Sequence, residues 1–266
     1  MNAYDSLNAY YSSYNEDERF DKRHNSVEYL TTLDYIRRHL SAGDRILEIG
    51  PGSGRYSHAL ARMGHRVDAV ELIPRNIELF REKTEPGEDV SIWQGTATDL
   101  SCFMDGTFDL TLLLGPMYHL FTEEEQRAAL SEAVRVTKTG GIVFVSYTMN
   151  EGTVVSFGFG RHNILPCLEK GMIDPVTFQC HSRPEDLFVL WRRERIFSMT
   201  AFLPVRRLHF VGTDMFTNYF RDMVDSMSEE EFEAWLAYHR SIREREDLVG
   251  MSFHTLDILK KEGAAS

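Results

Sequence analysis

Short apolar runs alternate with amphipathic stretches along residues 26–148, and this rhythm constrains the fold more than any other feature. The apolar runs are rich in Val, Ile, Leu and aromatic residues and end at Gly, Asp or Pro, as buried strands do. Strands that alternate with helical patterns predict βαβ units and a parallel sheet. The five strands expected here are Arg45–Ile49, Arg66–Glu71, Val90–Trp93, Phe108–Leu114 and Gly141–Tyr147.

The helices between these strands carry recognisable start and stop signals. Helical spacing predicts a helix over Val27–Leu40 and another over Tyr56–Met63, whose apolar face covers the sheet and which Gly64 closes. Thr122 and Glu125 form a Thr-x-x-Glu capping box that begins a third helix.

The rhythm breaks after the fifth strand. We interpret residues 150–204 as an inserted cap with an apolar helix around Leu187–Trp191, and expect two more strands at Val205–Val211 and Ser252–Leu259. The fold class is therefore α/β, with a seven-stranded, mostly parallel sheet, flanking helices and an inserted cap after the fifth strand. The expected division is a lid at 1–25, a core at 26–149, the cap at 150–204 and a C-terminal completion of the sheet at 205–266.

Composition excludes several classes of protein. The net charge of −12 repels phosphate backbones and anionic lipid surfaces, so a nucleic-acid partner is not expected. The three cysteines form no CxxC pair, and the adjacent Cys180 and His181 have no partner at ligand spacing, so neither a disulfide framework nor a metal site is expected. Without a signal-like N-terminus or a membrane-spanning apolar run, a cytoplasmic location is expected.

The segment Leu47–Gly54 leaves a strand and enters a helix through three alternating glycines. Glycine lets the backbone turn sharply and approach a ligand, and the helix N-terminus offers N–H groups that have no partner within the helix. A dinucleotide fingerprint needs glycine where Arg55 stands, which disfavours NAD. The segment resembles the class I methyltransferase family, whose first motif reads acidic-x-G-x-G-x-G and is matched by Glu48, Gly50, Gly52 and Gly54. The resemblance implies a Rossmann-like fold and S-adenosylmethionine as cofactor.

Two further motifs of the family have counterparts here. Glu71 ends the second strand, where the family's acidic residue holds the ribose hydroxyls, with Leu72 beside it. Residues 95–100 resemble the family's third motif, which places Ala97, Thr98 and Asp99 at the adenine. A surface charge for Glu71 and a helix cap for Asp99 remain the alternatives.

The fourth strand ends in a segment similar to the Gly-Pro-Leu-Tyr-His-Leu signature of a bacterial branch of the family, with methionine at position 117. The resemblance places Leu114 and Gly115 at the cofactor and Tyr118 and His119 at the acceptor. His119 is the candidate general base because imidazole titrates near neutrality, although it could instead cap or support the following helix. His254, followed by Lys260, is similar to the branch's last strand.

The tyrosine-rich N-terminus is a candidate lid, with Tyr11 or Tyr14 beside the cofactor and Arg19 near its carboxylate; an ordinary aromatic anchor is the alternative. The expected activity is methyl transfer to a small-molecule acceptor. A cofactor-sensing protein without turnover and an aminopropyltransferase-like enzyme are the competing functions, the second lacking an acidic pair near Gly115 and Pro116. The sequence identifies neither the acceptor atom nor the oligomeric state.

Overall fold

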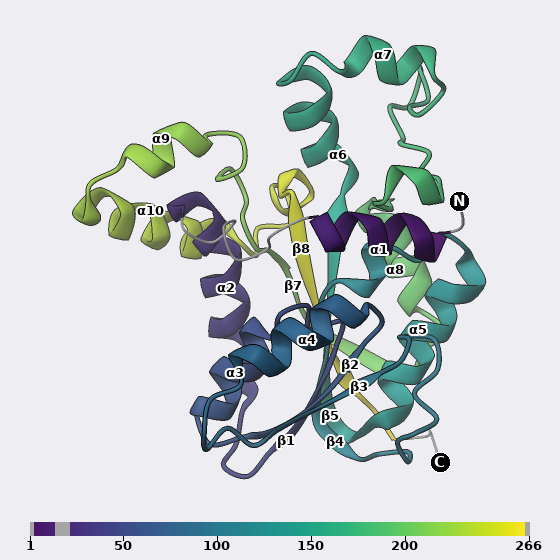
Figure 1. The fold of residues 1–266 in the computed structure, drawn as a ribbon. Coiled ribbons are helices and arrows are strands. Elements are labelled where there is room, and N and C mark those ends of the chain that lie inside the picture. Colours follow the sequence, from purple (N-terminus) through teal and green to yellow (C-terminus); the bar gives the residue numbers. More distant parts are fainter. Residues whose placement is uncertain (1–2, 14–21, 264–266) are drawn as a thin grey trace.

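The computed structural model describes residues 3–13 and 22–263 and contains one mixed sheet (Figure 1). Seven strands lie in the order β3-β2-β1-β4-β5-β8-β7, and β6 pairs with the end of β5. Strands β1 to β6 pair with one another in parallel, whereas β8 is antiparallel to both β5 and β7. The strands are β1 Arg45–Ile49, β2 Arg66–Glu71, β3 Val90–Gln94, β4 Phe108–Leu113, β5 Thr137–Met149, β6 Leu190–Trp191, β7 Val205–Gly212 and β8 His254–Lys261.

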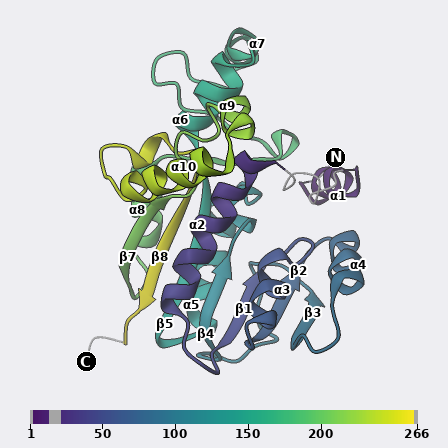
Figure 2. The same ribbon diagram turned by 90° about the vertical axis from the view of Figure 1, so that its left-hand side faces the viewer.

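Helices flank the sheet and cover one of its edges (Figure 2). The α-helices are α1 Ala3–Ser13, α2 Arg23–His39, α3 Arg55–Arg62, α4 Pro74–Lys83, α5 Glu123–Val136, α6 Asn150–Thr153, α7 Ile164–Glu169, α8 Arg193–Thr200, α9 Arg221–Ser226 and α10 Glu229–Ile242. The described residues also contain the shorter turns of helix η2 Pro116–Tyr118, η3 Val154–Phe159, η4 Pro184–Asp186 and η5 Val249–Met251. Among the helices of the described chain, none has the length and apolar character needed to cross a membrane.

Side chains that alternate along each strand build a core on each face of the sheet. Ile46 of β1 packs with α2 and α3, whereas its neighbour Leu47 packs on the opposite face with α5 and α8. Both side chains are fully buried, and each contributes about 1.5–3 kcal/mol through removal of apolar surface from water. The near-continuous apolar character of the strands follows from this burial on both sides.

The predicted α/β fold is confirmed, and the sheet contains all seven expected strands. The predicted capping box forms, because Thr122 Oγ1 accepts from Glu125 N–H while the Glu125 carboxylate accepts from Thr122 N–H. Met63 is an exception on its helix: it caps the C-terminus of α3 and is 38% exposed instead of covering the sheet.

The prediction of an apolar helix around Leu187–Trp191 is wrong. This segment contributes an additional strand, so the sheet has eight strands instead of the predicted seven. Leu190 and Trp191 form β6. Tertiary contacts override the apolar pattern here: the Trp191 ring packs edge-on against Tyr147, and its Nε1–H donates to Met117 O over 3.2 Å. Trp191 is fully buried in the same core as α5 and α8, so the chain has rejoined the main body before residue 204.

The antiparallel direction of β8 determines which residues lie at the end of the sheet where the parallel strands have their carboxyl ends. This end is called the covered edge below. Strands β1, β4 and β5 end at this edge, whereas β8 begins there with His254, opposite Thr148 of β5. In Figure 1, α1 crosses above this edge, and α6 and α7 project beyond it. Residues from both ends of the chain are therefore brought together beside the ends of the parallel strands.

Candidate active site

A cavity of about 1390 Å³ occupies this edge of the sheet. Its walls come from the ends of β1, β2 and β4, from η2 and β5, from α1, and from the segments around η3 and α9. A pocket for one drug-sized ligand takes about 300–1,000 Å³, so this cavity has room for two molecules. The crevice beyond the carboxyl ends of parallel strands is also where α/β folds generally bind ligands.

The glycine turn forms one wall of the cavity. Gly50, Gly52 and Gly54 have φ angles of +72°, +57° and +87°, in the left-handed region that favours glycine. A Cβ atom at Gly50 would lie 2.8 Å from the ring of Pro116, so the turn and the loop after β4 meet without room for a side chain. Gly54 is the N-cap of α3, which directs that helix's N-terminus towards the turn.

Glu71 ends β2 beside this turn and is 5% exposed. One carboxylate oxygen accepts from Gly52 N–H over 3.0 Å, and the other accepts from Ile73 N–H over 2.8 Å. Charge-assisted bonds of this kind hold a carboxylate in one orientation. The expected alternative of an ordinary surface charge does not fit this burial.

Glu48 and Leu72 also line the cavity. Glu48 is almost fully buried at the end of β1, where the Ser57 hydroxyl of α3 donates a hydrogen bond to it. This contact ties the acidic residue of the first motif to the helix that follows the glycines.

Only the first part of the loop after β3 lines the cavity. Gly95, Thr96 and Ala97 line the cavity. The structure does not bring Thr98 and Asp99 into that lining, because the Asp99 carboxylate turns to accept from Ser101 N–H over 3.0 Å. Of the two interpretations of Asp99, this geometry corresponds to the cap of a turn.

The loop after β4 brings Leu114, Gly115, Tyr118 and His119 to the cavity. Gly115 has a φ of +143° and begins η2. The Tyr118 hydroxyl donates to Ser146 Oγ over 2.7 Å, which fixes the ring against β5.

His119 is held at both ring nitrogens. Its Nδ1 lies 2.7 Å from Leu187 O, which can only accept, so Nδ1 carries the proton and Nε2 accepts from the Tyr11 hydroxyl at 3.1 Å. Burial lowers the pKa of His119 to about 4, despite the hydrogen bond to Leu187. The ring is therefore neutral near pH 7 and a weak base.

Helix α1 covers part of the cavity, and Leu7, Tyr10 and Tyr11 are in its lining. Tyr10 packs edge-on against Phe188, next to the Tyr11–His119 contact. The arrangement is compatible with both a lid and an aromatic anchor. Tyr14, the other tyrosine expected beside the cofactor, and Arg19, expected near its carboxylate, lie outside the described residues.

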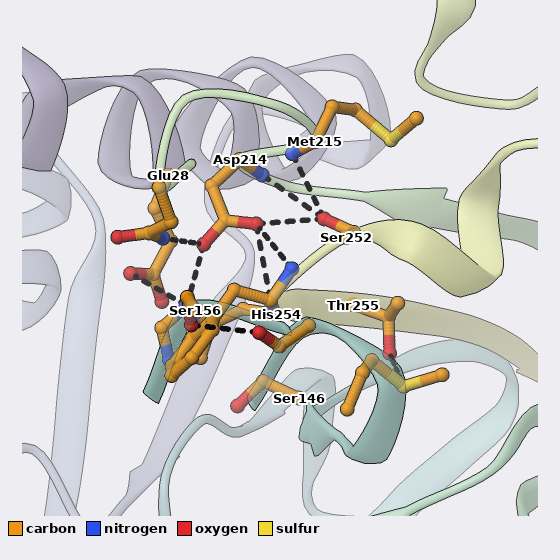
Figure 3. A network of polar contacts seen from close by, with 12 residues as sticks. Glu28, Ser146, Ser156, Asp214, Met215, Ser252, His254 and Thr255 are labelled. Carbon is orange, nitrogen blue, oxygen red and sulfur yellow. Dashed lines mark hydrogen bonds and ion pairs between the residues drawn. The ribbon is translucent and has the colours of Figure 1, made fainter. Parts of the chain in front are cut away.

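A second set of polar residues, which includes Glu28, Asp214 and His254, comes from segments far apart in the sequence (Figure 3). His254 Nδ1 lies 2.7 Å from Asp214 Oδ2 and 3.4 Å from Glu28 Oε2. The His254 and Tyr118 rings are 6.1 Å apart. Sequence reasoning identified His254 only through a resemblance, and it missed Glu28 and Asp214 because nothing local marks either as its neighbour.

These three residues are close enough to offer ligands to a metal ion. Asp214, however, already accepts from five donors: Ser252 Oγ, Phe253 N–H, His254 N–H, His254 Nδ1–H and Asn218 Nδ2. A carboxylate has about four lone-pair positions, so a metal would have to displace bonds that fix the loop. The geometry favours a hydrogen-bonded network over a metal centre.

Comparison with known proteins adds to this geometry. A family model described as a methyltransferase domain matches residues 46–141. A ubiquinone biosynthesis O-methyltransferase of Azotobacter vinelandii is 27% identical over 206 residues, which cover 74% of this chain and 84% of that protein. A relative of the same name from Xylella fastidiosa is 32% identical over 144 residues, and the match spans 52% of this chain but only 56% of that protein.

Solved structures share the fold. A SAM-dependent methyltransferase from Thermotoga maritima superimposes with a TM-score of 0.61 at 20% identity, covering 98% of this chain and all of that one. Another from Methanosarcina mazei gives 0.57 at 18% identity and covers 86% of this chain and 97% of that one.

Proposed function

We propose that this chain, which belongs to the class I S-adenosylmethionine-dependent methyltransferases, transfers the cofactor's methyl group to a small organic acceptor. The single observation that carries the proposal is the Glu71 carboxylate, anchored by two backbone N–H groups at the cavity wall beside the glycine turn. The small acceptor is supported by the size of the cavity and by relatives named for O-methylation in ubiquinone biosynthesis.

The residues of the first half of the sheet fit the cofactor. Each Glu71 oxygen accepts from a backbone N–H, and a carboxylate oxygen has two lone pairs, so Glu71 is a suitable acceptor for a ribose hydroxyl. The glycine turn lets the backbone approach the ligand, and the contact of Gly50 with Pro116 closes the space behind it. Gly95, Thr96 and Ala97 then supply the wall for the adenine in place of Thr98 and Asp99.

The other half of the cavity suits the acceptor. Tyr118, Phe188 and Phe253 give it aromatic surface, and Ser146 and Thr148 give it hydroxyls on one face of β5. Within the described parts of the chain, the buried Thr148 Oγ1 has no hydrogen-bond partner. A buried hydroxyl without a partner costs about 1–3 kcal/mol, and a polar group of the acceptor would remove that cost.

Bound S-adenosylmethionine supplies an activated methyl group on a sulfonium, so the protein's task is alignment and exclusion of water. The Tyr118 ring, fixed through Ser146, orients an acceptor beside the cofactor wall. Helix α1, fixed by the bond between Tyr11 and His119, covers the cavity and limits the entry of water.

Isothermal calorimetry with S-adenosylmethionine, decarboxylated S-adenosylmethionine and NAD tests the proposal. We expect binding of the first and no measurable heat with NAD. Release of S-adenosylhomocysteine in the presence of pooled small metabolites, without release in their absence, then identifies an enzyme. Tight binding without any release would identify a cofactor sensor, and preference for the decarboxylated form would identify an aminopropyltransferase.

A further inference from the structure

We infer that His254 is the general base for the methyl acceptor and that Asp214 is its positioning residue. The inference rests on the proposed methyl transfer and adds to it a class of acceptor, namely one whose attacking oxygen or nitrogen carries a proton that must leave. It also moves the role of base away from His119, the residue that the sequence favours.

The contact with Asp214 determines which His254 nitrogen is basic. Asp214 Oδ2 is an acceptor, so the ring nitrogen 2.7 Å away, Nδ1, carries the proton. In a neutral imidazole the other nitrogen, Nε2, then holds the lone pair. A carboxylate that fixes the tautomer and stabilises the imidazolium is the arrangement that makes a histidine an effective base.

Asp214 is built to hold this position. It is 1% exposed, and its carboxylate accepts from the backbone N–H groups of both Phe253 and His254. Burial by itself would raise the pKa of Asp214, but the adjacent His254 ring and these hydrogen bonds keep it below its usual value. The carboxylate therefore remains ionised and faces the ring as a negative charge.

His254 also lies where an acceptor has to be. It lines the cavity, its ring is 6.1 Å from that of Tyr118, and it stands opposite Thr148 in the sheet. Tyr118 in turn follows Pro116, which contacts the glycine turn. The base is thus one aromatic ring away from the wall that we assign to the cofactor. The carboxylate of Glu28, on α2, adds a second negative charge 3.4 Å from Nδ1.

His119 is the weaker candidate for electrostatic reasons. It is bonded to a neutral carbonyl and a neutral phenol, and burial lowers its pKa to about 4. His254 instead faces two carboxylates, which favour the protonated ring that a base must become.

The acceptor's X–H bond breaks and its proton passes to Nε2 of His254, while the X–CH₃ bond forms and the S–CH₃ bond breaks with its electron pair left on sulfur. The positive charge moves from the sulfonium to the imidazolium, which then returns its proton to water.

The first test measures the tautomer of His254 in the protein without ligands, through ¹⁵N chemical shifts of histidine-labelled chain. We expect the Nδ1–H form, and a shift towards Nε2–H in Asp214→Asn. A native chain with Nε2–H would overturn the assignment. The measurement needs neither cofactor nor turnover, so it stands even where the proposed function fails.

The second test uses 4-nitrophenol, whose anion absorbs visible light, bound to the chain saturated with S-adenosylhomocysteine at a pH where the free phenol is neutral. We expect an anionic band with the native chain and its loss in His254→Gln. His209→Gln is the matched control, because His209 pairs with Glu244 at 2.8 Å but does not line the cavity. The band should survive in that variant. Its absence from the native chain, or its persistence in His254→Gln, would overturn the inference.

The third measurement separates this inference from the proposed function. Calorimetry should give the same S-adenosylmethionine affinity for native chain, His254→Gln and His209→Gln, while release of S-adenosylhomocysteine with 4-nitrophenol falls about 10²–10⁴-fold in His254→Gln alone. Equal rates in His254→Gln and native chain would exclude the base. Loss of cofactor binding in the native chain would contradict the proposed function instead.

Discussion

The two halves of the cavity are assembled in different ways. The half that we assign to the cofactor comes from one run of βαβ units, in which the glycine turn, Glu71 and Ala97 follow one another along the sheet. The half that we assign to the acceptor combines Glu28, Tyr118 and His254 from widely separated segments, and Asp214 pairs with His254 from outside the cavity lining. Local backbone geometry builds the first half, whereas long-range pairing of β5, β7 and β8 builds the second. The following substitutions act on one half or on the contact between them.

Gly50→Ala disturbs the place where the two halves touch. The left-handed φ costs an alanine about 1–2 kcal/mol, and its Cβ would press on the Pro116 ring at 2.8 Å, adding roughly 1–3 kcal/mol. We expect the free energy of unfolding in urea to fall by the sum. Gly140→Ala is the matched control, since its φ is +83° with nothing within 4 Å of the new methyl group. An equal decrease in the free energy of unfolding in both variants would show that the Pro116 ring moves aside at little energetic cost.

His119→Gln tests the acceptor half through pH. The folded pKa of about 4 lies below the ordinary 6.5, so between those values the unfolded chain binds the extra proton and stability falls as pH falls. Over this pH range, the lowered pKa of His119 reduces the free energy of unfolding by about 3 kcal/mol. The variant should reduce the slope of unfolding free energy against pH by up to about 1.4 kcal/mol per pH unit.

His239→Gln is the companion variant for that measurement. Its pKa is also lowered to about 4 by burial, yet it bonds Thr31 on α2 and does not line the cavity. This variant should reduce the slope of unfolding free energy against pH by a similar amount, from a position outside the cavity lining. An unchanged slope in His119→Gln would mean that His119 is solvated in the folded chain.

Glu71→Gln acts on the cofactor half. Removal of a charged hydrogen-bond acceptor costs about 1.5–3 kcal/mol, so calorimetry should show S-adenosylmethionine binding about 10- to 100-fold weaker. Glu78→Gln, at an exposed carboxylate on α4 that pairs with Arg75, should leave the affinity unchanged. Identical affinities in all three proteins would remove Glu71 from the cofactor site.

Tyr11→Phe gives the smallest expected effect. It removes the hydroxyl that donates to His119, a hydrogen bond worth about 0.5–1.5 kcal/mol, without changing the ring. As a lid contact, it should weaken cofactor binding by up to about tenfold at equal thermal stability. Tyr4→Phe, at a 40% exposed tyrosine of the same helix, is the control. A change in melting temperature without a change in affinity would favour the aromatic anchor.

The accuracy of the sequence predictions follows the same division. Strands β1 to β5 and the capping box at Thr122 were predicted because their signals are local: an apolar period, a glycine, a side chain that reaches its own helix N-terminus. The segment around Trp191 was predicted wrongly because its partners, Tyr147 and Met117, are distant in sequence and draw it into the sheet.

The sequence by itself determined the α/β alternation, the glycine turn and the carboxylate one strand away, since each depends on conformational preferences of neighbouring residues. Only the tertiary structure decided that Asp214 meets His254 and that Tyr11 reaches His119. For Asp214 and His254 the physical reason is the antiparallel return of β8, which places a residue near the C-terminus beside the carboxyl ends of the parallel strands.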